Sequence, residues 1–401
     1  MNRISLPYGI DNFETVRTSN CYYIDKTGFI KELLGEAFSV NLLTRPRRFG
    51  KTLTMSMLAE FFDIRKDSRA LFDGLEISEE LELCRQWMNQ YPVLSLTLKD
   101  VEGSRFEDAY GLLKFVISSL CIEHSYLGES DKTDEYDVPL AKAGDYNYYE
   151  EMLNIVKRFL GMVWKSNPYL QFAVVSGCLR IAKESIFTGA NNFISNSISD
   201  THYQNYFGFT EEEVRTLLED AGFPEALLEI KRWYDGYRFG EKEIYCPWDV
   251  INHVRALMQN PGAEPENYWI DTSHNNIIRR FIELPDINVN DKFETLLSGS
   301  VIQVRIREDL TYDIADSSEE NLWSILYLTG YLTQVLPEDL PDGMKMERDK
   351  KVLRIPNEEI KSVFSDTVKA WFEDKIEAED RREFFREGMH DTVGRERVRA
   401  V

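Results

Sequence analysis

The sequence lacks the residues and segments on which several classes of protein depend. Its five cysteines and five histidines are scattered, with no spacing typical of a zinc site or a disulfide framework. No apolar stretch approaches the length of a transmembrane helix, and the N-terminus has neither the basic nor the apolar region of a signal peptide. We therefore expect reduced thiols, no membrane segment and a cytoplasmic protein.

Positive charge is also scarce. The 401 residues carry 69 Asp and Glu against 47 Lys and Arg, which gives a formal net charge of −22. This excess argues against a broad surface that coats nucleic acid, although it leaves room for a local basic groove. A hydrophobic content of 43% and a charged content of 29% are ordinary for a globular protein. The length allows two or three domains.

The strongest local basic patch lies in one short loop. It consists of Arg45, Pro46, Arg47, Arg48, Phe49, Gly50, Lys51 and Thr52. The apolar run at 40–44 predicts a short buried strand before it, and apolar residues near helical spacing at 53–62 predict a helix after it. Strand, tight loop, Gly-Lys-Thr and helix is the order of a phosphate-binding P-loop. An ordinary basic loop at a helix start is the alternative.

The residue types in this loop suit polyphosphate chemistry. Gly50 lets the backbone approach phosphates, and the following helix start presents unpaired N–H donors. Lys51 would reach the β- and γ-phosphates, and the hydroxyl of Thr52 would bind Mg²⁺. The motif G-x-x-x-x-G-K-[ST] has its first glycine where this chain has Arg45, while the Gly-Lys-Thr half is intact. The loop therefore predicts a nucleotide and Mg²⁺ as ligands.

Several further motifs follow in a fixed order: Tyr22–Thr27, Asp134–Asp137, Ser176–Ile181, Phe207–Thr210 and Trp233–Tyr237. With the loop at 45–52, they resemble the AAA-ATPase-like proteins of bacteria, from the N-terminus to about residue 365. These are P-loop ATPases that often carry a C-terminal PD-(D/E)XK-type nuclease domain. The resemblance implies ATP as the nucleotide and ATP hydrolysis as the activity. We find no D…(D/E)-x-K constellation on adjacent strands, so no nuclease domain is expected in this sequence.

An acidic pair after a strand serves hydrolysis in P-loop ATPases. The first carboxylate holds Mg²⁺ and the second orients or deprotonates the attacking water. By order, these roles fall to Asp134 and Glu135, with Asp137 in a supporting position. The preceding residues 123–133 are polar and do not predict a buried strand. Either the sheet lacks this strand, or another segment fills its place. The alternative for Asp134 and Glu135 is a solvated loop.

A second strand, expected at 172–177, resembles the sensor strand of AAA-type ATPases. There Ser176 would face the γ-phosphate or the water, and Arg180 would stabilise charge in the transition state. The alternative is a core strand followed by a surface arginine. Asp25 and Lys26 are equally well explained as a solvated pair or as nucleotide contacts, and the aromatic turn at 233–240 is better explained by packing than by ligand stacking.

The predicted fold class is α/β, a P-loop NTPase core of AAA/ASCE-like type with a helical lid and a small α/β C-terminal region. The predicted ranges are 1–35 (lead-in), 36–210 (P-loop domain), 211–285 (lid), 286–376 (C-terminal region) and 377–401 (charged tail). Within them we also expect strands at 92–98 and 296–309, a helix after the capping box of Thr210 and Glu213, a helix that begins near Pro247 and one at 268–282. Three functions stay open: a Mg²⁺-dependent ATPase acting as a switch or motor, a hydrolysis-deficient module that binds nucleotide or protein partners, and the ATPase part of a nucleic-acid-processing system. A homo-oligomer stays open as well.

Overall fold

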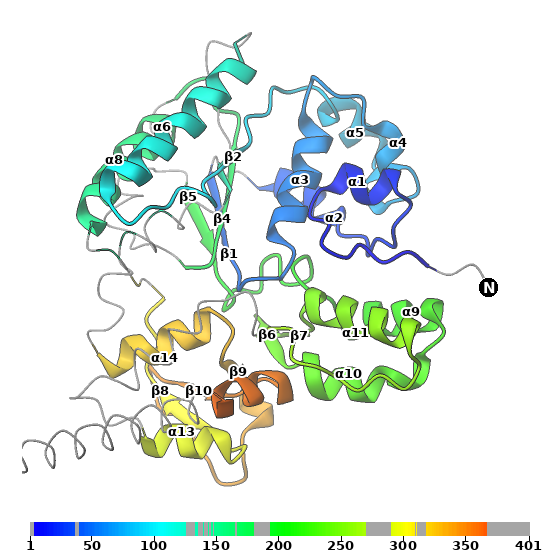
Figure 1. Cartoon of the computed structure of the whole chain (residues 1–401), viewed down its shortest axis with the longest axis vertical. Coiled ribbons are helices and arrows are strands. Elements are labelled where there is room, and N and C mark those ends of the chain that lie inside the picture. The colour runs from blue at the N-terminus through cyan, green and yellow to red at the C-terminus, as the bar shows by residue number, and fades with distance from the viewer. Residues whose placement is uncertain are drawn as a thin grey trace, which may run out of the picture.

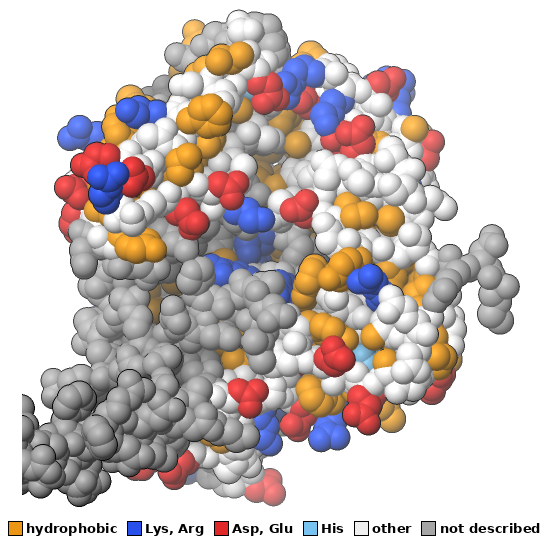
Figure 2. Space-filling view, viewed as in Figure 1, with side chains coloured by type: hydrophobic (Ala, Val, Ile, Leu, Met, Phe, Trp, Pro, Cys, Tyr) orange, Lys and Arg blue, Asp and Glu red, His pale blue; other side chains and the backbone are white. Residues whose placement is uncertain are grey.

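The computed structural model describes residues 4–36, 40–125, 133–134, 139, 143, 146, 148–164, 167–179, 193–269, 290–308, 310 and 318–366. Figure 1 shows a central sheet with helices on both faces, and below it a helical part next to a small part that contains strands. In the same view, Lys and Arg side chains gather near the centre of this face, between the sheet and the helical part below it (Figure 2). None of the helices in these ranges is long and apolar enough to cross a membrane.

The central sheet has five strands in the order β2-β3-β4-β1-β5, and all of its pairs are parallel. Its strands are β1 (Val40–Thr44), β2 (Leu96–Thr97), β3 (Thr133–Asp134), β4 (Ala173–Gly177) and β5 (Phe193–Asn196). A parallel sheet covered on both faces requires nearly continuous apolar strands, and both β1 and β4 are buried throughout. This architecture confirms the predicted fold class, an α/β P-loop core.

Side chains of β1 alternate between two hydrophobic clusters. Val40 and Leu42 join the cluster on the side of α6 (Phe106–Glu123) and α8 (Tyr149–Trp164), whereas Leu43 joins the cluster on the opposite side. That second side carries the N-terminal helices and the helix after the loop (Figure 1). They are α1 (Phe13–Thr18), α2 (Gly28–Gly35), α3 (Lys51–Phe62), α4 (Arg69–Phe72), η1 (Glu76–Glu79) and α5 (Leu81–Trp87).

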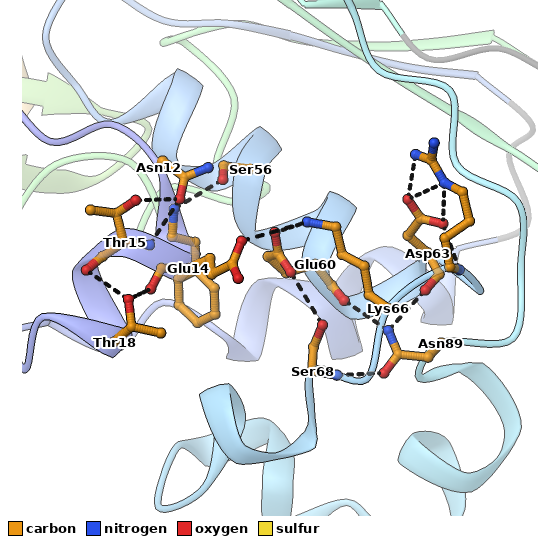
Figure 3. A network of polar contacts seen from close by, with 12 residues as sticks. Asn12, Glu14, Thr15, Thr18, Ser56, Glu60, Asp63, Lys66, Ser68 and Asn89 are labelled. Atoms are coloured by element: carbon orange, nitrogen blue, oxygen red, sulfur yellow. Dashed lines mark hydrogen bonds and ion pairs between the residues drawn. The ribbon is translucent and has the colours of Figure 1, made fainter. Parts of the chain in front are cut away.

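A network of polar contacts surrounds the carboxyl end of α3, away from the loop (Figure 3). The side chain of Glu60 is 3% exposed, forms an ion pair with Lys66 and accepts a hydrogen bond from Ser68. Asn89 donates to the carbonyls of Glu60 and Asp63 at 3.0 Å each. Asn89 thereby supplies donors to carbonyls at the end of α3 that have no partner within the helix.

The described residues 211–269 of the range predicted as a lid are called the lid part below. The helices of this part form a hydrophobic cluster of their own. The elements of the lid part are α9 (Glu211–Ala221), η2 (Pro224–Ala226), α10 (Leu227–Tyr234), β6 (Tyr237–Phe239), β7 (Lys242–Ile244) and α11 (Pro247–Gln259). The predicted capping box is confirmed, since Thr210 and Glu213 bond each other's backbone N–H. Pro247 lies in the first turn of α11, as predicted. The residues after 269 in the predicted helix 268–282 lie outside the described ranges.

The C-terminal region forms a three-stranded antiparallel sheet in the order β8-β10-β9. Its elements are α13 (Asn290–Leu297), β8 (Ile302–Val304), α14 (Glu319–Leu328), β9 (Thr333–Val335), η5 (Pro337–Asp339) and β10 (Lys351–Arg354), and a helix follows at 358–366. We had no prediction of α13. Leu322, Leu326 and Leu353 share one hydrophobic cluster with Phe49 of the loop. The C-terminal region therefore packs directly on the P-loop side of the sheet.

Some strand predictions were wrong in extent. The range 92–98 was predicted as one strand, but only Leu96–Thr97 pair in the sheet. Of the two possibilities for the strand before Asp134, a filled position is the one observed, since Thr133–Asp134 pair with β2 and Thr133 pairs with β4.

Candidate phosphate-binding site

The loop between β1 and α3 makes a left-handed turn. Arg48 has φ +70° and Gly50 has φ +81°, and Gly50 is also the N-cap of α3. A glycine accepts this conformation at no steric cost, whereas Arg48 must be held in it. No side chain caps the first turn of α3. Its N–H groups and the positive end of the helix dipole are therefore available to an anion.

Lys51 folds back over the loop. Its ammonium nitrogen donates to the carbonyl of Arg45 at 3.2 Å and to that of Pro46 at 3.0 Å. The residue as a whole is 5% exposed. The sulfur of Cys178, just after β4, lies 3.7 Å from the same nitrogen. A lysine held by carbonyls of its own loop carries a charge that a phosphate group would attract more strongly. Thr52 follows in the first turn of α3 and is half-buried.

Arg45 does not point its charge toward the surface of the loop. It is fully buried, and its guanidinium donates to the carbonyls of Thr44, Asn196 and His202. It also lies 5.1 Å from the ring centroid of Phe207 and 5.4 Å from that of Phe239. Burial lowers the pKa of Arg45 to about 10. The prediction that its side chain adds to a phosphate-binding basic patch does not fit these contacts. Arg45 instead fills the space beneath the loop.

Pro46 and Phe49 also face the interior. A Cβ atom at Gly330 would meet the ring of Pro46 at 3.1 Å, so the turn after α14 touches the loop. Phe49 is 1% exposed, and its ring lies 5.0 Å from those of Tyr237 and Phe239. The aromatic turn at 233–240 is therefore a packing element, as predicted, and its packing partner is the loop itself.

Arg48 points into the lid part. Its guanidinium donates to the carbonyl of Tyr268, lies 3.7 Å from a carboxylate oxygen of Asp249, and sits over the rings of Trp248 and Trp269. The side chain is only 10% exposed. Of the three arginines, Arg47 is the exposed one. The expected patch of Arg45, Arg47, Arg48 and Lys51 is thus divided between the interior and the surface.

The sheet brings Asp134 and Ser176 to the same edge as the loop. Thr133 pairs with Val175, and Ser176 pairs with Leu43 of β1. Asp134 follows Thr133 and Ser176 follows Val175, so the backbones of Asp134 and Ser176 lie side by side at the carboxyl end of the sheet. Strands lie about 4.8 Å apart, so the backbone of Asp134 is about 10 Å from β1. Ser176 is fully buried.

Glu135, Asp137 and Arg180 lie outside the described residues. Their predicted roles remain predictions. Among the residues that are described, no group of three or more His, Cys, Asp or Glu side chains is close enough to hold a metal ion. Thr52 and Asp134 stay the predicted ligands of Mg²⁺.

The motif at 22–27 has a role that neither alternative foresaw. Lys26 is 9% exposed and donates to Glu213 and to the carbonyl of Asn205. Asp25 accepts hydrogen bonds from Thr27 and from the backbone N–H of Glu76. These residues are neither a solvated pair nor part of the loop. They tie the N-terminal segment to the lid part and to η1.

Sequence reasoning missed three residues near the loop: Cys178, Asp249 and Glu359. Cys178 stands inside a recognised motif, yet nothing in the sequence places its thiol beside Lys51. The two acids come from helices distant in sequence, and a carboxylate in a helix is ordinarily assigned to the solvated face. The feature that could have drawn attention to Asp249 is its position among apolar residues at 250, 251 and 254.

Comparison with known proteins points to a family of predicted ATPases. Residues 7–130 and 133–187 match a family model described as "Predicted AAA-ATPase". A curated relative is an uncharacterized protein in the vnfD 5′ region of Azotobacter chroococcum mcd 1, with 29% identity over 303 residues. The match covers 68% of this chain, and the chain spans 55% of the length of that relative.

A solved structure with some likeness is the Walker-type ATPase of Pyrococcus abyssi. The alignment covers 87% of this chain and 97% of the other, with 12% sequence identity and a TM-score of 0.44. A score this low does not by itself establish a shared fold. The fold assignment rests on the strand order and on the loop geometry given above.

Proposed function

We propose that the chain is a member of the predicted AAA-ATPase family, whose model matches residues 7–130 and 133–187, and that it binds Mg²⁺-ATP at the loop 45–52 and hydrolyses it. The energy of binding and hydrolysis would drive a conformational switch or motor. Nucleotide binding is the part that the geometry of the loop supports, while hydrolysis depends on residues after β3.

One observation carries the proposal: the uncapped amino end of α3 follows a left-handed loop whose lysine lies across it. The backbone N–H groups of residues 50–52 would bind the β-phosphate, and Lys51 would exchange its two carbonyl partners for phosphate oxygens. Thr52 and Asp134 would hold Mg²⁺, which would neutralise phosphate charge as the reaction proceeds. Glu135 would orient the water, and Ser176 and Arg180 would contact the γ-phosphate.

Thermal unfolding with and without Mg²⁺-ATP tests binding. A ligand at about 100 times its Kd stabilises a protein by about 2.7 kcal/mol, which should raise the unfolding temperature by several degrees. Lys51→Ala should abolish this rise. Lys114→Ala is the matched control, because Lys114 lies on the exposed face of α6. A rise that persists in Lys51→Ala would place the nucleotide elsewhere and contradict the proposal.

A hydrolysis-deficient module is the second candidate, and the polar sequence at 123–133 before Asp134 favours it. Phosphate release in single turnovers separates the two. If hydrolysis occurs, Glu135→Gln should slow it by about 10²-fold or more while ATP binding stays within about twofold. Binding without measurable phosphate release in the unmodified protein would favour the module. An ATPase that serves nucleic-acid processing remains a third possibility, which stimulation of phosphate release by DNA or RNA would support.

A further inference from the structure

Three charged side chains from three parts of the chain meet in the interior behind the loop. Arg48 comes from the loop, Asp249 from the first turn of α11, and Glu359 from the helix at 358–366. Asp249 and Glu359 are fully buried. Two buried carboxyl groups beside one arginine need an explanation, because a buried unpaired charge is strongly unfavourable.

The hydrogen bonds show which oxygen atoms lack a partner. One oxygen of Glu359, Oε1, accepts the backbone N–H of Tyr268 at 2.6 Å and that of Trp269 at 3.0 Å. Its other oxygen and both oxygens of Asp249 are buried and accept no hydrogen bond from an N–H group. The carboxyl group of Glu359 and the thiol of Cys246, a weak donor, both lie within hydrogen-bonding reach of Asp249. Two ionised carboxylates would repel, but one proton between them turns the contact into a hydrogen bond.

We propose that Glu359 is protonated and donates to Asp249, so that the pair presents a single negative charge to Arg48 and thereby positions the P-loop for nucleotide. Asp249 and Glu359 are positioning residues in this proposal, since neither would touch the nucleotide. The inference rests on the proposed nucleotide site, and it adds control of that site by the lid part and the C-terminal region.

The charge state of the pair agrees with its surroundings. Burial raises the pKa of Glu359, with the charge of Asp249 adding to the effect, and burial raises the pKa of Asp249 against the opposing effects of Cys246, Glu359 and Arg48. Because Arg48 lies 3.7 Å from Asp249, it favours the ionised form of Asp249 and leaves the proton on Glu359. The other titratable groups around the pair are Cys246 before α11, Tyr234 of α10, Tyr237 of β6 and Tyr268. Burial raises the pKa of each, so they stay neutral and leave Arg48 as the balancing charge.

Arg48 matters because its backbone is left-handed in the turn that precedes Gly50 and Lys51. A left-handed backbone is unfavourable for a residue other than glycine, and side-chain contacts must offset this cost. The carboxylate of Asp249, the carbonyl of Tyr268 and two tryptophan rings supply those contacts. Loss of the charge on Asp249 would release Arg48 and loosen the backbone donors of the loop.

The test compares Glu359→Gln with Asp249→Asn in the full chain, by calorimetric titration with Mg²⁺-ATP. Gln keeps the same shape, accepts the same two N–H bonds and donates to Asp249 as a protonated Glu would. ATP affinity should therefore stay within about twofold in Glu359→Gln and fall about tenfold or more in Asp249→Asn and in Glu359→Leu, which lacks a donor. Asp108→Asn is the control, because Asp108 pairs with Arg105 on the surface.

Equal losses in Glu359→Gln and Asp249→Asn would overturn the shared proton, and unchanged affinity in Asp249→Asn would overturn the positioning of the loop. Should Asp249→Asn fail to fold, the pH dependence of unfolding in Glu359→Gln decides the question. The unfolding temperature of this variant should rise relative to that of the parent between about pH 5 and pH 8, since the parent alone holds a proton that its unfolded chain releases. A difference that does not change with pH would overturn the proposal. This readout needs no ATP, so it is independent of the proposed function.

Discussion

The ammonium nitrogen of Lys51 and the thiol sulfur of Cys178 lie 3.7 Å apart. Lys51 is the first residue of α3, and Cys178 directly follows β4. The contact therefore lies at the carboxyl end of the sheet, beside the loop. Cys178 is half-buried, and Cys121 on α6 is exposed. A thiol reagent therefore has a cysteine at the site and another that is remote from it.

We predict that Mg²⁺-ATP slows maleimide labelling of Cys178 by about tenfold or more, because phosphates and the reorganised Lys51 would cover the thiol. Cys121 should be labelled at the same rate with and without nucleotide, which makes it an internal control. Peptide mass spectrometry after timed labelling measures both rates in one sample. Equal protection of the two cysteines would indicate a global effect instead of occupancy of the loop.

Restoring the motif glycine should destabilise the protein. Arg45→Gly removes a guanidinium that fills the space between Phe207 and Phe239 and leaves the carbonyls of Asn196 and His202 unpaired. The loss of packing and hydrogen bonds should lower the free energy of unfolding by about 3 kcal/mol. Relief from burying one charge offsets only part of this, because three carbonyls already stabilise the charge.

Arg47→Gly is the matched control for this prediction, since it places the same substitution at an exposed position of the same loop. This variant should lower the free energy of unfolding by about 1 kcal/mol, the usual backbone effect of glycine. Urea unfolding of both variants measures the difference. Equal losses of unfolding free energy in Arg45→Gly and Arg47→Gly would mean that the contacts of the buried Arg45 guanidinium contribute little to stability.

The ion pair between Lys26 and Glu213 should be worth more than surface pairs. Its atoms are 2.6 Å apart and the two side chains are 11% and 25% exposed. Lys26→Ala should lower the free energy of unfolding by about 2–4 kcal/mol, since it leaves Glu213 and the carbonyl of Asn205 without their donor. Lys31→Ala should cost much less than Lys26→Ala, because its pair with Glu80 is exposed and screened by solvent. Similar costs in the two variants would contradict this account.

We predict that the buried carboxyl group of Asp235 makes the stability of the folded protein depend on pH. It is 3% exposed, and burial raises its pKa from 3.8 to about 6, with Glu243 adding to the effect and the N–H of Gly236 opposing it. Between these two values the folded protein holds a proton that the unfolded chain has lost. The contribution of this carboxyl to the free energy of unfolding therefore falls as pH rises through that window.

Asp235→Asn should remove this contribution. Its unfolding temperature, compared with that of the parent, should increase as pH rises from about 4 to about 6 and then level off. Asp342→Asn, in an exposed turn, should follow the parent at every pH. A constant difference between Asp235→Asn and the parent would mean that Asp235 titrates at its ordinary pKa in the folded protein.

The sequence by itself determined the local features of this protein. Strand, loop, Gly-Lys-Thr and helix follow from the apolar pattern at 40–62 and from the need for glycine at φ +81°, and both depend only on neighbours in the chain. The capping box at Thr210 and Glu213 and the proline at the start of α11 are local for the same reason. Where the pattern was weak, as at 92–98 and 296–309, the predicted strands were too long.

Only the tertiary structure decided where the side chains of the loop point. Nothing within a few residues of Arg45 or Arg48 shows that one is enclosed by Phe207 and Phe239 and the other by Trp248 and Trp269, because these partners arrive from distant elements. The pairing of Asp249 with Glu359 is of the same kind. Burial converts charges that would be solvated on an isolated helix into groups that must share a proton or a counter-charge, and burial is a property of the whole fold.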